Sequence, residues 1–385
     1  MKIGLPHLIA IALVSVLGIR ASVSAQSTLK ETFKDDFLMG VALNEAQFTG
    51  RNEWQAELAV KQFNSITPEN VMKWEKIHPR AGEFDFAAAD KFVAFGERHG
   101  MLIIGHTLIW HSQTPRWVFE KAPGRPVDRE TLLSRMSNHI HAVVGRYKGR
   151  VKGWDVVNEA LNEDGSMRQS PWMRIIGEDY LLKAFEFAHQ ADPEAELYYN
   201  DFSLENPEKR KGAMALIEKL KAAGAPITGL GTQMHIRIDT PEPELIDQTL
   251  TDFRKLGLKI MVTELDVDVL PSRNFDRGAE VSRRETASAA LNPYTNGLPA
   301  KVEQELAERY AQVFAVFLKH RDILERVTFW GVTDGQSWLN DWPIQGRTSY
   351  PLLFDRKGLP KAALDAVIQT QKNRLSAMEA AGKSS

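Results

Sequence analysis

Cysteine does not occur among the 385 residues of this chain. Its absence excludes disulfide bonds, thiol catalysis and a lipid anchor attached through a cysteine. Stability must therefore come from a large hydrophobic core, and the content of 43% hydrophobic and 25% charged residues is that of an ordinary globular protein.

The chain also lacks a strong excess of charge, since its formal net charge is only −2 at pH 7. A protein without a basic face is poorly suited to nucleic acid or anionic lipid, so we expect no nucleic-acid partner. Cofactor motifs are missing too. No nucleotide-binding GxGxxG or GxxxxGK motif follows a strand pattern, and the serine-nucleophile motif GxSxG is absent. His106 and His111 have no clear third metal ligand. We therefore expect no cofactor and no metal.

A run of membrane-spanning length is also missing. The apolar run from Ile3 to Ile19 is shorter than the roughly 20 residues that a bilayer span needs, which disfavours the alternative of a membrane anchor. With Lys2 before it and small residues after Arg20, it predicts a secretory signal peptide over residues 1–25, cut after Ala25. Cleavage would take the formal charge from −2 to −4. We expect a secreted or periplasmic monomer with no membrane contact.

Short apolar runs of strand type alternate with longer amphipathic segments along the rest of the chain. This alternation predicts an α/β protein, and its number and order match a (β/α)8 TIM barrel formed by a single domain, residues 26–385. A doubly wound open sheet is the alternative. The predicted strands are Phe37–Asn44, Phe63–Glu69, Leu102–Trp110, Val151–Glu159, Glu196–Asp201, Ile227–His235, Lys259–Val267 and Val327–Asp334.

Two segments do not follow this alternation. The stretch from Pro271 to Ala300 is the longest irregular one, and because long loops in compact domains are usually functional or disordered, we expect it to line one end of a cleft. The C-terminal stretch from Leu375 to Ser385 is expected to fray.

Nearly every predicted strand is apolar through its body and polar at its C-terminal end. In a (β/α)8 barrel these ends converge on the face that carries the active site, so we expect the polar residues to share one cleft. They are Asn44, Glu69, Asn70, His106, His111, Asn158, Glu159, Asn200, Asp201, Gln233, His235, Glu264, Asp266 and Asp334.

Glu159 and Glu264 end the fourth and seventh predicted strands, which lie on opposing walls of an eight-stranded barrel. Cleavage of a glycosidic bond requires two such carboxyl groups, separated by about 5 Å in the retaining mechanism. A solvated surface carboxylate is the alternative for any single Glu. Both residues, however, follow strands of buried type, which favours a catalytic pair.

Their neighbours predict different roles for the two glutamates. Asp266 lies on the same strand face as Glu264, and His235 ends the adjacent strand, so His235 can bind Glu264 and be held by Asp266. A carboxylate bound in this way stays ionised, as a nucleophile should. Glu159 has mostly apolar neighbours besides Asn158, which favours a raised pKa and the acid role. The alternative is that His235 and Asp266 form only a structural pair.

Tryptophans flank several of the polar strand ends. The flat faces of sugar rings stack on aromatic rings, whereas sugar hydroxyls bond to Asn, Gln, His and Lys. Packing at the end of the barrel is the alternative for any single tryptophan. The candidates are Trp74, Trp110, Trp117, Trp330, Trp338 and Trp342.

With these residues assembled, the chain resembles family 10 glycoside hydrolases, the retaining endo-β-1,4-xylanases of the (β/α)8 type. The likeness extends from about Thr28 to Gln371. Its motifs are TPENVMKWEKIHP, GHTLIWHSQTPRW, GWDVVNEALNEDG, YYNDF, GLGTQMHI, VTELDV and FWGVTDGQSWLNDWPIQGRTSYPLLFD.

The resemblance implies hydrolysis of xylan and xylo-oligosaccharides, with Glu159 as the acid/base and Glu264 as the nucleophile. It also implies sugar contacts, which fall to Glu69, Asn70 and Lys73 on the glycone side, to His106, Trp110, Asn158, Gln233 and His235 around the cleaved sugar, and to Trp330 and Trp338 as an aromatic lid. The stretch from Pro271 to Ala300 is longer than the barest family pattern, which leaves the aglycone-side preference open.

Three other functions compete with this interpretation. Another retaining β-glycanase, such as a cellulase, would have to admit the CH2OH group that glucose carries and xylose lacks. A sugar-binding barrel without activity would be expected to have lost one of the two carboxylates. A structural or interaction protein gives no reason for the polar strand ends.

Overall fold

Eight parallel strands close into a barrel in the computed structural model of the chain, which describes residues 27–271 and 285–382. The strand order is β12-β1-β2-β3-β6-β7-β8-β10, and pairing of β10 with β12 closes the barrel. The predicted (β/α)8 fold is confirmed, and the predicted signal segment lies outside the described residues. The strands are β1 (Leu38–Leu43), β2 (Ser65–Pro68), β3 (Leu102–Trp110), β6 (Gly153–Asn158), β7 (Glu196–Asp201), β8 (Gly229–Thr232), β10 (Lys259–Asp268) and β12 (Leu324–Phe329).

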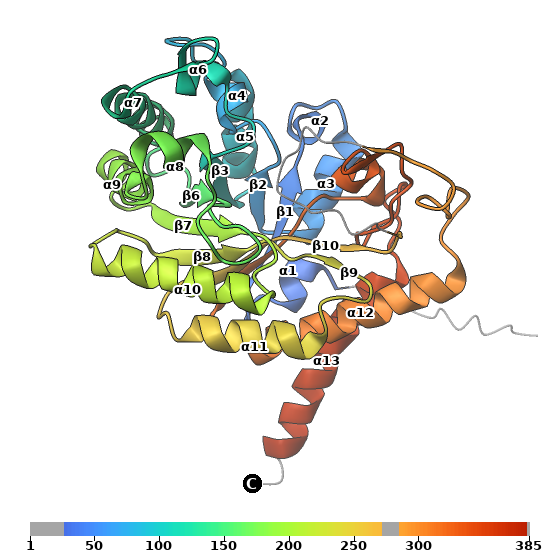
Figure 1. Cartoon of the computed structure of the whole chain (residues 1–385). Coiled ribbons are helices and arrows are strands. Elements are labelled where there is room, and N and C mark those ends of the chain that lie inside the picture. The colour runs from blue at the N-terminus through green and yellow to red at the C-terminus, as the bar shows by residue number, and fades with distance from the viewer. Residues whose placement is uncertain (1–26, 272–284, 383–385) are drawn as a thin grey trace, which may run out of the picture.

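A long helix follows each barrel strand, and these helices surround the barrel (Figure 1). The alternation read from the sequence is therefore the order of elements in space. The helices are α3 (Glu53–Gln62), α5 (Ala87–Arg98), α7 (Arg129–Arg146), α9 (Tyr180–Ala191), α10 (Pro207–Ala222), α11 (Pro243–Arg254), α12 (Ala300–Lys319) and α13 (Ala362–Gly382).

Helix α1 precedes the first barrel strand, and the other short elements lie in the connections between the barrel strands and the long helices. Strand β9 pairs with the end of β10, which sets His235 opposite Asp266. The short elements are α1 (Leu29–Thr32), α2 (Glu45–Phe48), α4 (Trp74–Ile77), α6 (Arg116–Phe119), β4 (Glu120–Ala122), β5 (Arg125–Pro126), α8 (Pro171–Ile176), β9 (His235–Arg237), β11 (Glu285–Thr286), η1 (Asp334–Gln336), η2 (Trp338–Asn340) and β13 (Ile344–Gln345).

Period-two alternation along the strands sends side chains into the barrel and toward the helices in turn. Ile104, Tyr198 and Met261 form a separate cluster of buried apolar side chains on β3, β7 and β10. Most of the other buried apolar residues of the strands, among them Val41, Val156 and Val262, belong to the larger core cluster that the helices share. The strands are thus covered on both faces, as parallel strands require.

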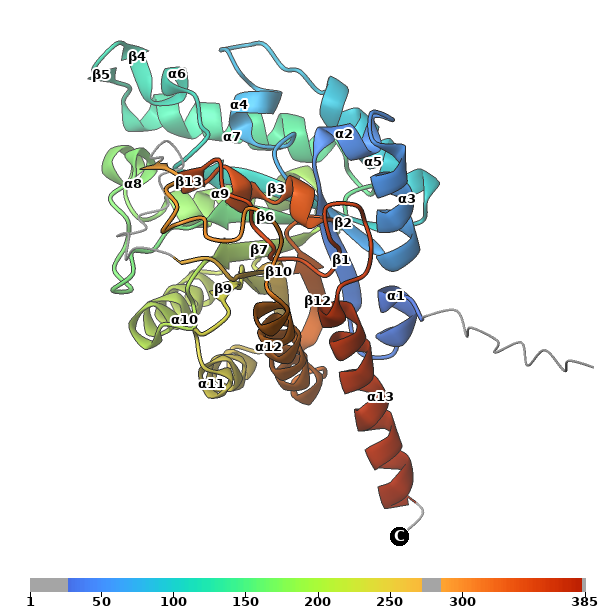
Figure 2. The same cartoon turned by 90° about the vertical axis from the view of Figure 1, so that its right-hand side faces the viewer.

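The two segments that do not follow the strand–helix alternation are the C-terminal stretch and the stretch from Pro271 to Ala300. Helix α13 continues to Gly382 and extends beyond the barrel in both views, so the expected fraying from Leu375 is wrong up to that residue (Figures 1 and 2). Leu, Met, Glu and Ala are strong helix formers, and their propensity outweighs the polar composition of the tail. In the stretch from Pro271 to Ala300, Glu285–Thr286 forms strand β11 and pairs with β13, whereas residues 272–284 lie outside the described part of the chain.

Candidate active site

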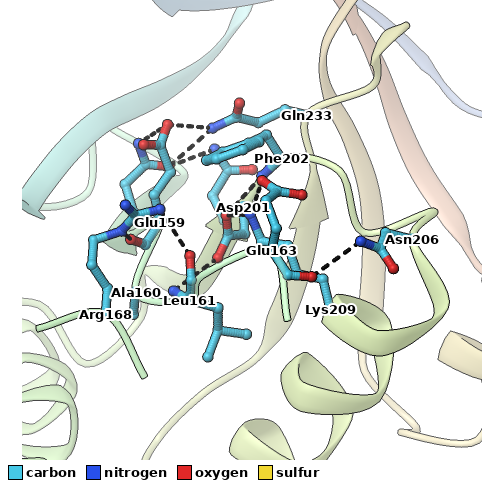
Figure 3. A network of polar contacts seen from close by, with 12 residues as sticks. Glu159, Ala160, Leu161, Glu163, Arg168, Asp201, Phe202, Asn206, Lys209 and Gln233 are labelled. Atoms are coloured by element: carbon cyan, nitrogen blue, oxygen red, sulfur yellow. Dashed lines mark hydrogen bonds and ion pairs between the residues drawn. The ribbon is translucent and has the colours of Figure 1, made fainter. Parts of the chain in front are cut away.

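Glu159 directly follows β6 and is buried. Its Oε2 atom accepts a hydrogen bond of 2.8 Å from Trp110 Nε1, at the end of β3. Its Oε1 atom accepts from Gln233 Nε2 at 3.0 Å (Figure 3) and from Asn158 Nδ2 at 3.2 Å. Residues from three separate parts of the barrel mouth therefore hold this carboxyl group.

The pKa of Glu159 lies above its ordinary value. Burial is the main cause, and the negative charge of Asp201 raises the pKa further. The hydrogen bonds from Gln233 and Trp110 act in the opposite sense without outweighing burial. A carboxyl group with a raised pKa retains its proton to higher pH and can give it to a leaving group.

Glu264 lies in β10 and is also buried, but its pKa is lowered. Burial acts to raise this pKa, yet the hydrogen bond from His235 and the charges of His106 and His235 outweigh it. Asn200 Nδ2 donates a further hydrogen bond of 2.8 Å to Oε1. Glu264 is therefore ionised under conditions in which Glu159 is protonated.

His235 lies between two carboxylates. Its Nε2 atom lies 3.2 Å from Glu264 Oε2 in hydrogen-bond geometry. Its Nδ1 atom lies 3.1 Å from Asp266 Oδ1, at ion-pair distance but without the alignment of a hydrogen bond. Burial acts to lower the pKa of His235, but Asp266 and Glu264 raise it to about 10. The predicted contacts among these three residues are present, and Trp338 Nε1 donates to Asp266 Oδ2 at 2.7 Å.

Two amide side chains connect the carboxyl groups of Glu159 and Glu264. Asn200 Nδ2, which donates to Glu264, also donates to Asn158 Oδ1 at 2.9 Å. Asn158 Nδ2 in turn donates to Glu159 Oε1 at 3.2 Å. The charge of Glu264 contributes to the raised pKa of Glu159, so the two groups interact electrostatically. Their separation of about 5 Å stays a prediction.

Lys73 is the centre of a second polar group at the site. Its Nζ atom donates to Asn70 Oδ1 at 3.1 Å and to Gln113 Oε1 at 2.9 Å, and lies 4.9 Å from the centre of the Trp110 ring. Burial lowers the pKa of Lys73 even though Glu264, Glu69 and Glu159 act to raise it. Burial raises the pKa of Glu69, because it disfavours the charged form of a carboxyl group as it does that of an amine.

A pocket of about 740 Å³ adjoins this second group. Asn70 and Gln113 line it, and it extends to Asn44 and Arg51 near helix α2. The pocket therefore joins the predicted glycone-side residue Asn70 to Asn44, at the first strand end of the barrel.

Aromatic rings surround the His235 side of the site. The Trp330 ring meets the rings of His106 and His235 edge-on, with centroid distances of 5.4 and 6.1 Å. Trp338 stacks on Trp342 at 4.9 Å. His106 is itself oriented by Asp155, whose Oδ2 atom lies 2.8 Å from His106 Nδ1.

Three sequence-based expectations about the cleft are wrong. Asp201 is fully buried and pairs with Lys209 at 3.0 Å, so it does not face the cleft. Trp74 is buried in the core, where it stacks on His139 with ring centroids 3.7 Å apart, so it has no face free for a sugar. Asp334 is fully buried, and its carboxylate binds Lys361 Nζ at 2.9 Å and the backbone N–H of Leu352 at 2.8 Å. A strand-end position alone did not distinguish these residues from the cleft residues.

Three residues of the site received no role in the sequence analysis. The sequence pattern marks Asn200 only as a polar strand end, although it contacts both Asn158 and Glu264. Gln113 lies three residues beyond β3, within the motif HSQTP. Asp155 lies in the middle of the buried strand β6, and a polar residue inside an apolar run was the available signal for it.

Within residues 27–271 and 285–382, no cluster of three or more His, Asp or Glu side chains is arranged to hold a metal ion. In the same part of the chain, none of the helices combines the length and the apolar character needed to cross a bilayer.

The family model of Glycosyl hydrolase family 10 matches residues 28–370 of the chain. The chain belongs to this family. Among its relatives, endo-1,4-beta-xylanase A of Xylanibacter ruminicola is 44% identical over 92% of this chain and 96% of its own. The endo-1,4-beta-xylanase of Geobacillus stearothermophilus is 40% identical over 90% of this chain and 99% of its own.

A solved structure of the family supports the same assignment. A GH10 endoxylanase retrieved from a sugarcane soil metagenome superimposes with a TM-score of 0.85 at 48% identity, covering 89% of this chain and 99% of that one. The family 10 chain described here is therefore a glycoside hydrolase with the barrel typical of its relatives.

Proposed function

We propose that this glycoside hydrolase is an endo-1,4-β-xylanase that cleaves internal β-1,4-xylosidic bonds with retention of configuration. The opposite pKa shifts of Glu159 and Glu264 carry this proposal, because the retaining mechanism needs one protonated and one ionised carboxyl group. The names of the relatives supply the substrate class.

In the first step Glu264 attacks the anomeric carbon while Glu159 protonates the departing glycosidic oxygen. His235 and Asn200 hold the Glu264 carboxylate ionised and oriented. In the second step Glu159, now a carboxylate, takes a proton from a water molecule that attacks the glycosyl-enzyme, which releases the sugar and restores both groups. Asn158 is assigned to the sugar 2-hydroxyl, a contact that strengthens in the transition state.

The remaining predicted residues are assigned to sugar binding. Glu69, Asn70 and Lys73 are assigned to the glycone side, where Gln113 joins them. Trp330 and Trp338 are assigned to the lid, which would close the space that the CH2OH group of a glucose unit needs.

Glu264→Ala should abolish turnover, whereas Glu159→Ala should reduce turnover of xylan far more than that of an aryl xyloside with an activated leaving group. The activated leaving group needs no proton, so only the deglycosylation step suffers. Unfolding curves of both variants should show that they remain folded. Equal losses of Glu159→Ala on the two substrates would contradict the acid/base assignment.

Initial rates on xylan and on soluble cellulose test the substrate. A xylanase should act much faster on xylan, and comparable rates on both would favour a broader β-glycanase. The configuration of the first product, read by proton NMR before mutarotation, tests retention.

We also propose that residues 1–25 are a signal peptide and that residues 26–385 form a secreted or periplasmic monomer. The charged start, the apolar run and the small residues before Ala25 support cleavage at that point. N-terminal sequencing of the exported protein and light scattering of the purified protein test the two parts separately.

A further inference from the structure

Asp201 and Lys209 form an ion pair that is closed off from solvent. Asp201 ends β7, Lys209 lies in α10, and both residues are 0% exposed. Lys209 Nζ lies 3.0 Å from Asp201 Oδ1 and 3.3 Å from the centre of the Phe202 ring. Burial of two charges is costly and is often matched in stability by apolar replacements, so stability alone does not account for such a pair.

The other oxygen of Asp201 faces the segment that follows Glu159. Asp201 Oδ2 accepts hydrogen bonds from the Tyr199 hydroxyl and, at 3.4 Å, from the backbone N–H of Leu161. The Tyr199 oxygen accepts the N–H of Ala160 at 3.2 Å. Asp201 therefore binds the chain one and two residues beyond Glu159, directly and through Tyr199 (Figure 3).

The backbone of Glu159 needs this support because its φ angle is +59°, in the left-handed region. A residue other than glycine is strained there and stays only where its surroundings hold it. The N–H of Glu159 donates to Asn200 O at 2.9 Å, and its carbonyl accepts from Arg168 Nε at 3.0 Å. Arg168 Nη2 also donates to Leu161 O at 2.8 Å.

Helix α10 packs directly against the segment between Glu159 and Arg168. A Cβ atom on Gly212 would lie 2.3 Å from the carbonyl oxygen of Gly165, so the two backbones touch. Asn206 Nδ2 donates to Glu163 O at 3.0 Å, and Lys209 Nζ lies 3.5 Å from Glu163 Oε1. Lys209 thus contacts both Asp201 and the segment that carries Glu159.

The charges that act on Glu159 come from several strands. Asp201 and Glu264 favour its protonated form, and Asp201 has the larger effect of the two. Lys73 interacts with Glu159 as a positive group and favours the ionised form of Glu159. Lys209 Nζ lies 3.0 Å from Asp201 Oδ1, and of the two charges in this pair it is Asp201 that stands among the main causes of the raised pKa of Glu159.

We propose that the Asp201–Lys209 ion pair is a positioning device for Glu159, which fixes the strained backbone and keeps a negative charge beside its carboxyl group. The proposal rests on the proposed function, in which Glu159 is the acid/base. It predicts that loss of the pair lets Glu159 release its proton at lower pH, so that the acid form is lost earlier as the pH rises.

The main test is the double variant Asp201→Asn/Lys209→Met, which removes both charges and leaves neither unpaired. The basic limb of the pH profile of kcat/KM on xylan should move to lower pH by ~0.5 to 1 unit. The carboxyl titration of Glu159, followed by carbon-13 NMR in protein labelled at Glu and assigned with Glu159→Gln, should move in the same direction. A purely structural role would lower activity or stability without moving either titration.

The matched control is Asp334→Asn/Lys361→Met, another buried ion pair, with an N–O distance of 2.9 Å. This control should leave the basic limb where it is, and an equal shift would overturn the proposal. If the double variant does not fold, Asp201→Asn alone is measured instead, since Lys209 retains Glu163 as a partner. A folded variant with an unmoved or raised limb also overturns the proposal.

The two proposals fail in different ways. If the wild-type protein does not cleave xylan, the proposed function fails, while the NMR titration still tests the effect of Asp201 on Glu159. If the wild type cleaves xylan and neither titration moves in the folded variant, only the positioning role is lost.

Discussion

Asn200 donates a hydrogen bond of 2.8 Å to the Oε1 atom of Glu264, the group proposed as the nucleophile. The same amide donates to Asn158, and its oxygen accepts from Thr263 Oγ1 at 2.7 Å. Asn200 is fully buried and is therefore fixed on all sides. Its donation to Glu264 is one of the contacts that lower the pKa of that carboxyl group.

Asn200→Ala should reduce kcat/KM on xylan ~10- to 100-fold, since a hydrogen bond to a charged group contributes about 1.5–3 kcal/mol. Loss of the donor raises the pKa of Glu264, so the acid limb of the pH profile should move to higher pH. Thr263→Val, which removes only the bond to the Asn200 oxygen, should have a smaller effect. An unchanged acid limb in Asn200→Ala would contradict this electrostatic role.

Gly231 makes room for Asn200. A Cβ atom at this position would lie 2.4 Å from Asn200 Oδ1 and 2.8 Å from Thr263 Cγ2. Gly231→Ala should displace the amide, lower kcat and reduce the free energy of unfolding by about 1–3 kcal/mol. The control is Gly145→Ala on helix α7, where no atom lies within 4 Å of the added carbon. It should leave activity unchanged and raise stability by roughly 0.5–1 kcal/mol.

The barrel and the catalytic pair were predictable because each depends on a pattern within one strand. Apolar runs turn polar toward their C-terminal ends, where Glu159 directly follows β6 and Glu264 lies in the second half of β10. The different environments of the two glutamates were also predictable in direction, since Asp266 lies in the same motif as Glu264 and His235 ends the adjacent predicted strand.

Contacts between distant elements were not predictable in this way. Trp74 follows one predicted strand and Trp110 ends another, yet Trp74 stacks on His139 of helix α7 in the core whereas Trp110 binds Glu159. Lys209 looks like an exposed residue in a charged helix, and only the approach of α10 to β7 makes it the partner of Asp201. Such packing depends on the complete fold and leaves no local signal.

Trp110→Phe should move the basic limb in the opposite direction to the Asp201 variants. Phenylalanine retains a ring but lacks the N–H that donates to Glu159 Oε2 at 2.8 Å, a bond that lowers the pKa of Glu159. We expect the basic limb of kcat/KM to rise by ~0.5 to 1 unit. Trp117→Phe is the matched control, because it removes a bond of 3.0 Å to Pro79 O and should leave the limb in place. A downward shift in Trp110→Phe would contradict this assignment.

The stacked histidines His78 and His139 should make the fold sensitive to acid. His139 stacks on Trp74 at 3.7 Å, and neither ring nitrogen of either histidine has a hydrogen-bond partner. Burial lowers the pKa of His78 to about 4 and that of His139 well below its ordinary value.

Because the folded state favours the neutral rings whereas the unfolded chain binds protons near pH 6.5, the stabilisation is complete above about pH 6.5. It is lost as the pH falls toward 4, and since the shift of His78 alone corresponds to ~3 kcal/mol, we expect a loss of at least that size in urea unfolding between pH 7 and pH 4. His139→Phe retains an aromatic ring that cannot be protonated. As the pH falls, its free energy of unfolding should therefore decrease less than that of the wild type. His99→Gln, at an exposed position on the surface, should follow the wild-type curve. Parallel curves for His139→Phe and the wild type would show that protonation of the buried ring does not limit acid stability.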